Sequence, residues 1–336
     1  MRILLIAPEF YRYWDATRWG LQQLGHEVEV SVYDRRATLR DSYTYARDVH
    51  IPRRLRGQNP NPELQRRAHA ILRGPLDAKN YDAVIVTNGA VVGSEIFEPL
   101  RDRGVPVVLW LQDELSRLIF HTVESMRVFT AVGTYSADDV ALMQSHGLDA
   151  ALVPNGFDPR LKVEGTPRQR DVVFIGARDA HRTSILQALT DQGLPVMAYG
   201  NQWSHRLRDR VRGLSWDRPD IRSRPNVSRA EASQLLFDAL CAVNIHVPGI
   251  QDGINPRTFE ICGVGGLQAT DRADISGYYD PGTEILLYRS VDELGELIRR
   301  AASDRAWAAQ IREAARQRTL DEHTIVHRCR QLVDMM

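Results

Sequence analysis

The sequence has little of what would tie it to an extracellular or membrane environment. Its 336 residues include three cysteines, at positions 241, 262 and 329, which are too few and too scattered for a disulfide framework or a zinc site. No run approaches the roughly 18 apolar residues of a membrane-spanning helix, and the apolar run at the N-terminus is too short for a signal peptide. We therefore expect a cytoplasmic protein without a transmembrane segment.

An excess charge of one sign is also lacking. Forty-three basic residues balance 43 acidic ones, so the formal net charge is zero, and overall charge predicts no attraction to nucleic acid. Only Lys79 and Lys162 are lysines, and the arginines are spread among the acids. The chain length and a hydrophobic content of 43% suffice for two cores, so two domains are expected.

What is present is an alternation of strands and helices. Residues 2–7 and 27–33 read as strands with a helix over 14–24 between them, which is a βαβ unit and predicts a parallel sheet. Further strands are expected at 82–87, 105–111 and 127–132, and helices at 93–103 and 137–146. The arginine-rich interval 34–80, with a helical piece around 63–72, is either a ligand-facing surface or a solvated basic one.

The second half restarts the pattern. Strands are expected at 171–175, 195–199, 239–246, 267–270 and 284–288. Ser228 and Glu231 have capping-box spacing, and Ser290 caps another helix. The tail, 305–335, reads as one long helical region in which His323 and His327 lie four apart; packing is favoured over metal binding because no third ligand is implied.

The stretch 247–271 has the clearest signals for a ligand. Asn255 is a good N-cap and Pro256 suits the first helical position. Loop glycines, including Gly253, would present amides to a phosphate at this helix N-terminus. Asp252 and Glu260 lie eight positions apart, and a carboxylate such as that of Glu260 prefers neutral hydroxyls to phosphate. The alternative is a capped helix with a solvated glutamate.

The run from Asn255 to Glu260, NPRTFE, followed by Gly263 and Thr270-Asp271, resembles the donor-site signature of CgeB-like glycosyltransferases, relatives of glycosyltransferase family 4. The turn 25–28 (GHEV), the turn 153–158 (PNGFD after Val153) and the stretch 176–182 match further family motifs in order. The resemblance implies a GT-B fold, in which two Rossmann-like α/β domains with parallel sheets face each other across a cleft. It also implies C-terminal helices that cross back to the N-domain.

The resemblance implies a boundary scheme of 1–158 for an acceptor domain, 171–318 for a donor domain and 319–336 for the returning helix. It implies that Glu260 binds the nucleotide ribose, and that Asp252, an aspartate where the family has glutamate, contacts the donor sugar. Arg182 falls at a family lysine that neutralises the diphosphate. The other residues implied in donor binding are Gly176, Arg178, Val227, Gly253, Ile254, Asn255 and Arg257.

Asp113 follows an apolar strand, where ligands gather in parallel sheets. The family often has a histidine where this chain has Gln112, so the resemblance supports a catalytic role for Asp113 only weakly, and a helix cap is the alternative. For Arg178 and Arg182 the alternative is an ordinary surface position. No cofactor is expected beyond a nucleotide-diphosphate sugar as donor substrate, and the acceptor is not specified.

The chain contains no Asp-x-Asp, the metal-binding pair of the other main glycosyltransferase fold, so metal-independent transfer is expected. The family relation also implies retention of anomeric configuration. Two alternatives stay open: a GT-B-like assembly protein that binds a nucleotide sugar without transferring it, and a sugar-nucleotide epimerase.

Overall fold

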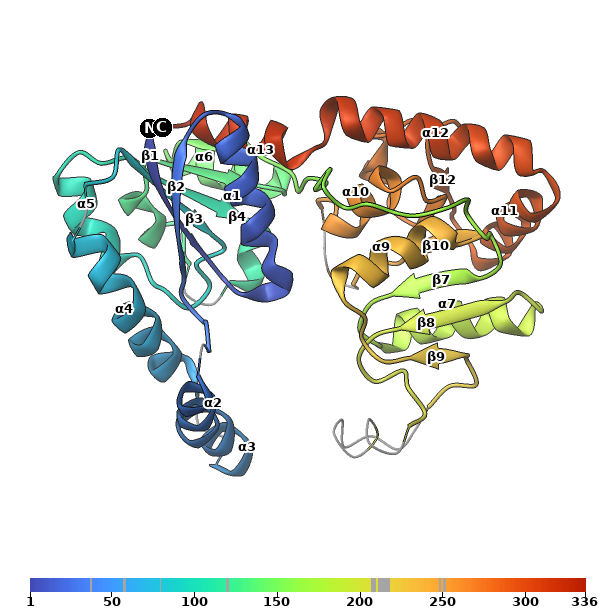
Figure 1. Ribbon diagram of the computed structural model, residues 1–336, viewed down its shortest axis with the longest axis horizontal. Helices are drawn as coiled ribbons and strands as arrows, with labels where there is room; N and C mark the ends of the chain where they lie inside the picture. The colour runs from blue at the N-terminus through green and yellow to red at the C-terminus, as the bar shows by residue number, and fades with distance from the viewer. Residues whose placement is uncertain are drawn as a thin grey trace. The chain divides into compact units, whose positions relative to one another are not determined.

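Two six-stranded parallel sheets organise the chain (Figure 1). The computed structural model describes residues 1–36, 38–56, 59–78, 80–118, 121–206, 210, 218–247, 249 and 252–336. One unit comprises Met1–Pro154 together with Ile325–Met336, and the other comprises Asn155–Thr324. The predicted fold class, two Rossmann-like parallel α/β units, is confirmed.

The first sheet has the order β2-β1-β3-β4-β5-β6. Its four inner strands are short apolar runs buried on both faces, as expected when helices cover both sides of a parallel sheet, whereas the edge strands β2 and β6 are partly exposed. Parallel pairing sets Ile3 opposite Val28 and Leu4 opposite Val84. The strands are β1 (Arg2–Ala7), β2 (Glu27–Val32), β3 (Ala83–Thr87), β4 (Val107–Leu111), β5 (Ala131–Thr134) and β6 (Ala150–Leu152).

Helices cover both faces of this sheet. On one face α4 (Asn61–Ala78), α5 (Glu98–Asp102) and α6 (Ala137–Ser145) contribute to a core with Leu4 and Val84. On the other face lie α1 (Tyr13–Gln23) and the C-terminal α13 (Ile325–Val333).

Helix α13 packs closely on α1. A methyl group added at Gly20 of α1 would lie 2.7 Å from Cys329 Sγ, so the crossing depends on the missing side chain. Cys329 Sγ also donates to Thr17 O at 3.4 Å.

The second sheet has the order β12-β11-β10-β7-β8-β9. Its strands are β7 (Val172–Ile175), β8 (Val196–Tyr199), β9 (Ser223–Arg224), β10 (Cys241–Asn244), β11 (Gln268–Thr270) and β12 (Leu286–Leu287). Helices on the two sides of the sheet close two cores, one around Phe174 and Val243 and the other around Val173 and Ala242. The helices are α7 (Ala180–Asp191), α9 (Arg229–Asp238), α10 (Pro256–Gly263), α11 (Val291–Ser303) and α12 (Arg305–Glu322).

Side-chain capping signals placed helix starts correctly, whereas the helix predicted at 93–103 without such a signal is an α-helix only over Glu98–Asp102. The capping box of Ser228 and Glu231 forms, and Ser290 caps α11. The strand predicted at 127–132 begins too early: Ser125–Val128 is a 3-10 turn, and β5 begins at Ala131. The buried apolar side chains of Val128 and Phe129, just before β5, gave the prediction its early start.

The predicted helical tail is two helices. The chain leaves helical geometry at His323 and Thr324, where Thr324 forms a parallel bridge with Phe157. His323 is therefore not on a common helix face with His327. Its ring packs against Phe259, Tyr278 and Tyr279, which agrees with the predicted packing role.

Candidate functional site

The second sheet reverses its strand order between β7 and β10, and most of the predicted site residues lie there. β8 and β9 extend the sheet on one side of β7, whereas β10, β11 and β12 extend it on the other. Helix α7 follows β7 and α10 follows β10, so both helices start from the carboxyl edge of neighbouring strands. In open parallel sheets the crevice at such a reversal is where ligands bind.

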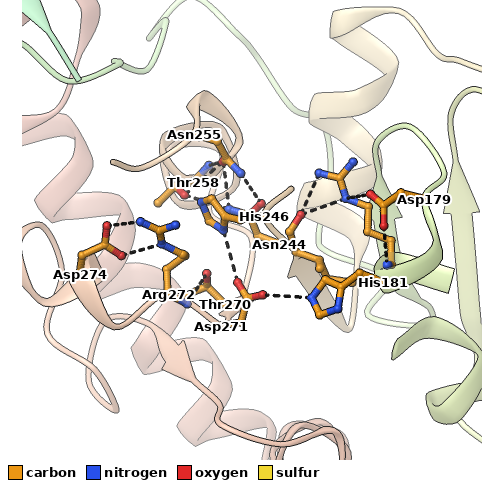
Figure 2. Close-up of polar contacts among 12 residues, drawn as sticks. Asp179, His181, Asn244, His246, Asn255, Thr258, Thr270, Asp271, Arg272 and Asp274 are labelled. Carbon is orange, nitrogen blue, oxygen red and sulfur yellow. Dashed lines mark hydrogen bonds and ion pairs between the residues drawn. The ribbon is translucent and has the colours of Figure 1, made fainter. Parts of the chain in front are cut away.

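The N-terminus of α10 is fixed by polar side chains (Figure 2). Asn255 Oδ1 accepts from the Thr258 N–H at 3.1 Å, which confirms the predicted N-cap, and Pro256 occupies the first turn. The amide groups of Asn255 and Asn244 exchange hydrogen bonds of 2.9 and 3.1 Å, and Asn244 also donates to Thr258 Oγ1 at 2.9 Å. This network holds the positive end of α10 at the carboxyl end of β10.

Arg182 joins the loops that follow β7 and β10. Its Nε and Nη2 donate to Ile245 O at 3.2 and 2.9 Å, and its Nη1 donates to Ala177 O at 3.1 Å. Asp179 caps α7 by accepting from the Arg182 N–H at 2.8 Å, and its carboxylate lies 3.3 Å from Arg182 Nε. Burial lowers the pKa of Arg182, yet arginine keeps its charge at neutral pH. The structure therefore fixes a half-buried positive charge at this edge, and Arg182 is not an ordinary surface arginine.

The other two predicted residues after β7 have defined partners. The Arg178 N–H donates to Asn201 O at 3.1 Å, and its Nε donates to Thr183 Oγ1 at 3.4 Å. The Gly176 N–H donates to Tyr199 O at 2.9 Å, which commits that amide to the β7–β8 pairing. Any donor-binding role of Gly176 therefore rests on its small size and not on its N–H.

Glu260 is buried in α10, with an exposed fraction of 3%. Its Oε2 accepts from Arg257 Nη1 at 2.7 Å, and its Oε1 lies 3.6 Å from Arg229 Nε. Arg229 Nη1 donates to Asp158 Oδ2 at 3.2 Å, and Asp158 also accepts from Arg160 at 2.9 Å. The alternative of a solvated glutamate is thus wrong, because Glu260 is one acid in a buried network with arginines.

Asp158 and Arg229 were not among the predicted site residues. Burial alone would raise the pKa of Asp158, but the hydrogen bond from Arg160 and the charge of Arg229 bring it below its usual range. The sequence placed Asp158 in a turn and Arg229 one residue after a helix cap. Neither position signals an ion pair between segments that are 71 residues apart.

The loop before α10 is described in part. Pro248, Ile250 and Gln251, which belong to the stretch predicted to bind phosphate, lie outside the described residues. Gly249 and Gly253 have φ values of +90° and +84°, a region that favours glycine. The loop glycines therefore have a conformational reason as well as the predicted role of presenting amides.

The remaining predicted donor residues differ in how they face the site. The Ile254 side chain is fully buried, so only its backbone is placed for a ligand, and Val227 is half-buried against the same core. Asp252 lies near Arg272: the pKa of Arg272 is raised mainly by its hydrogen bond to Asp274, with a smaller contribution from Asp252.

Two histidines and an aspartate, to which the sequence analysis assigned no role of their own, lie beside these groups (Figure 2). His246 Nδ1 is 3.4 Å from Asp271 Oδ1, and His181 Nε2 is 4.0 Å from Asp271 Oδ2. His246 is 5% exposed, and its Nε2 has no hydrogen-bond partner among the described residues. Because a buried polar atom without a partner is costly, Nε2 is suited to a ligand.

A sequence signal for His246 and Asp271 did exist. His246 comes two residues after β10, and Asp271 directly follows β11. These are the carboxyl ends of adjacent parallel strands, the same positional rule that selected Asp113.

Asp113 and Gln112 belong to the first unit, after β4. Burial raises the pKa of Asp113, and Arg117, whose Nη1 is 3.4 Å away, partly offsets this. The 3-10 turn that follows begins after Glu114 and has no side-chain cap, so the helix-cap alternative for Asp113 is wrong. The Gln112 N–H donates to Asn88 Oδ1 at 2.6 Å.

Within the part of the chain that the structure describes, no group of three or more histidine, cysteine, aspartate or glutamate side chains could hold a metal ion. None of the described helices is both long and apolar enough to cross a membrane.

Residues 180–334, which include α7, α10 and the returning α13, match the model of a family described as Glycosyl transferase-like. No curated protein matches the sequence.

Solved structures share the fold over nearly the whole chain. Sucrose-phosphate synthase from Thermosynechococcus elongatus is 15% identical with a TM-score of 0.67, covering 99% of this chain and 98% of its own. Anabaena HepE in complex with UDP-glucose is 15% identical with a TM-score of 0.62, again covering 99% and 98%. A putative UDP-N-acetylglucosamine 2-epimerase from Listeria monocytogenes is 11% identical with a TM-score of 0.57, covering 99% and 95%.

The class that emerges is a protein with the GT-B fold. Residues 180–334, which match the glycosyl transferase-like family model, include Arg182 and Glu260.

Proposed function

We propose that the protein is a CgeB-like glycosyltransferase related to family 4. It would transfer a sugar from a nucleotide-diphosphate sugar to an acceptor, with retention and without a divalent metal. One observation carries the proposal: two capped helix N-termini, a fixed Arg182 and the buried Glu260 gather where the second sheet reverses, within the half that matches the family. The UDP-glucose complex of HepE, which shares this fold, supports a nucleotide sugar as the ligand.

The diphosphate is assigned to the positive edge of the second sheet. The N-terminus of α10, Arg182, Arg178 and the amides near Gly253 supply positive charge and N–H donors there. His246 Nε2, which has no hydrogen-bond partner among the described residues, adds a donor when the ring carries a proton on that nitrogen. This set of groups replaces the charge of a metal ion.

The nucleoside and sugar are assigned to the acids and to the α9 side. Glu260 would accept from the ribose hydroxyls, Asp252 from a hydroxyl of the donor sugar, and the loop at Val227 would face the base. Arg257 holds one oxygen of Glu260 and so orients the carboxylate for this task.

The reaction breaks the bond between the anomeric carbon and the diphosphate oxygen. The acceptor oxygen forms its bond on the same face, and its proton passes to the departing diphosphate. The protein then contributes position and charge stabilisation more than a strong base. Arg182 is placed for the developing charge, because its guanidinium is already held in place by Ile245 O and Ala177 O.

The test is incubation with a panel of UDP-, GDP- and ADP-sugars, first without acceptor, followed by NMR spectroscopy. Slow release of free sugar whose first-formed anomer matches the donor supports a retaining transferase. Release of the opposite anomer refutes retention. Activity that is lost in excess chelator and restored by magnesium or manganese refutes the metal-free proposal.

An epimerase is the second candidate, favoured by the structural likeness to the putative 2-epimerase. Interconversion of the nucleotide sugar without release would establish it. Binding without any conversion, also in the presence of candidate acceptors, would support the non-catalytic assembly protein.

A further inference from the structure

A basic helical segment of the first unit exposes large apolar side chains. It runs through α2 (Leu39–Tyr45), a π-helical turn (Ala46–His50) and α3 (Ile51–Arg56). Figure 1 shows α2 and α3 at the end of α4, outside the sheet and its covering helices. Leu39, Tyr43, Ile51 and Leu55 are 91%, 66%, 51% and 76% exposed.

These four side chains follow a spacing of four residues. They occupy positions 39, 43, 51 and 55, every fourth residue except position 47. In a regular α-helix each step of four residues moves the side chain about 40° round the axis, so the row would spiral away. The wider π-helical turn between Tyr43 and Ile51 rotates less per residue and counteracts this drift. The exposed apolar residues therefore form one stripe along the segment.

Arginines flank the stripe. Residues 35–56 contain seven arginines and two aspartates, a local formal charge of +5 in a chain whose net charge is zero. Both acids are engaged: Asp41 closes the capping box of α2, and Asp48 pairs with Arg47 and Arg67. Among the described residues Arg40, Arg53 and Arg54 make no ion pair, and all three are exposed.

The opposite side of the segment is what attaches it to the unit. Val49 of the π-helical turn is buried, and Arg67 of α4 donates to Thr44 Oγ1 at 3.2 Å and to Asp48 at 2.9 Å. The segment therefore already packs against the first unit through its inner side, and the exposed stripe is a separate surface. A pocket of about 360 Å³ lies between the segment and α4, lined in part by Thr44, Tyr45 and Arg47.

We propose that residues 39–55 dock the protein on the surface of an anionic lipid bilayer. The apolar stripe would enter the headgroup boundary while the flanking arginines pair with lipid phosphates, as for interfacial amphipathic helices. Charge complementarity selects the anionic surface, because residues 35–56 carry a local formal charge of +5. The proposal is independent of the transferase assignment. If both hold, the pocket beside Tyr45 lies next to the docked face.

The experiment is co-sedimentation of the full-length protein with vesicles of phosphatidylcholine, with and without 30% phosphatidylglycerol, in low and high salt. Binding is expected only with the anionic vesicles, and high salt should weaken it. The double variant Arg53→Gln/Arg54→Gln should lower partitioning about 30-fold, from about 1 kcal/mol for each arginine near the surface. The control Arg289→Gln/Arg316→Gln removes the same charge from exposed positions of the second unit and should bind like the unmodified protein.

A second pair of variants tests the apolar stripe. Leu39→Ser/Leu55→Ser should lower partitioning at least tenfold, whereas the single control Leu142→Ser, at an exposed leucine of α6, should not. Melting curves that match the parent protein establish that each variant is folded. Equal sedimentation of all variants, or no sedimentation with anionic vesicles, overturns the proposal. Soluble polyglutamate tests whether the surface binds an acidic polymer in place of a bilayer. If the Leu39→Ser/Leu55→Ser variant binds polyglutamate as well as the parent protein does, the proposal is overturned.

Discussion

Replacing Glu260 with glutamine tests the assignment of the ribose site most directly. The buried carboxylate has Oε2 bonded to Arg257 at 2.7 Å and Oε1 3.6 Å from Arg229, a distance beyond a hydrogen bond. Glutamine keeps the shape but removes the charge and one acceptor, so a ribose hydroxyl would lose a charge-assisted hydrogen bond. Such bonds contribute about 1.5–3 kcal/mol, so Kd for the nucleoside diphosphate should rise about 10- to 150-fold.

Loss of affinity alone does not separate a ribose contact from a disturbed fold, because Glu260 also pairs with two arginines. Removing one partner of a buried pair is itself destabilising, by about 3–5 kcal/mol in fully buried cases. The side chains of Arg257 and Arg229 are 26% and 18% exposed, so water can partly solvate them. We therefore expect Glu260→Gln to lower the free energy of unfolding by less than in a fully buried pair.

A double-mutant cycle isolates the contact. Calorimetry would compare UDP with 2′-deoxy-UDP and 3′-deoxy-UDP on the parent protein and on Glu260→Gln, or the guanosine series if the panel favours GDP. Removal of the contacted hydroxyl should weaken binding in the parent and have much less effect in the variant, a coupling of about 1–2 kcal/mol. If each deoxy analogue lost the same affinity on both proteins, Glu260 would not touch the ribose, whatever the change in Kd.

Four further outcomes follow. Arg182→Ala should lower turnover about 10²-fold with a smaller change in donor Kd, since it removes the positive charge that Ile245 O and Ala177 O hold in place; a change in KM alone would contradict a role in the departing charge. If Asp113 acts as a carboxylate, its raised pKa should place the acidic limb of kcat above the usual aspartate value of about 4, and a limb unchanged in Asp113→Asn would exclude it. His246→Ala should weaken binding of the nucleoside diphosphate about tenfold, while the monophosphate of the same nucleoside is affected less; equal losses would argue against a diphosphate contact. Gly263→Ala puts a methyl group 2.3 Å from the Phe157 ring and should lower the free energy of unfolding by about 1–2 kcal/mol, whereas Gly277→Ala, with nothing within 4 Å, should not; equal melting points would mean that Phe157 can move aside.

Much of the architecture was predictable because its signals are local. A run such as residues 3–7 is apolar throughout because both faces of a parallel strand are covered. Asn255-Pro256 and Ser228 with Glu231 specify helix starts through bonds that span only three residues. Signals of this kind gave the alternation of strands and helices, and with it the expectation of two parallel sheets.

The same locality explains the errors. The apolar Val128 and Phe129 just before β5 read as part of a strand, and only pairing with β4 fixes β5 at Ala131. The break at His323 is decided by aromatic rings from other segments and by the bridge of Thr324 to Phe157. The local sequence around each position does not indicate these contacts, because their partners lie in distant segments.

Local sequence patterns sufficed to select a capped helix with Glu260, loop glycines and arginines after a strand as candidates for a ligand site. The tertiary structure added their burial and their partners. It showed Glu260 buried between Arg257 and Arg229, Arg182 fixed by backbone oxygens, and His246 with a buried nitrogen beside Asp271. The physical reason is that burial and pairing depend on segments far apart in the chain, which the parallel order of the strands brings to one edge.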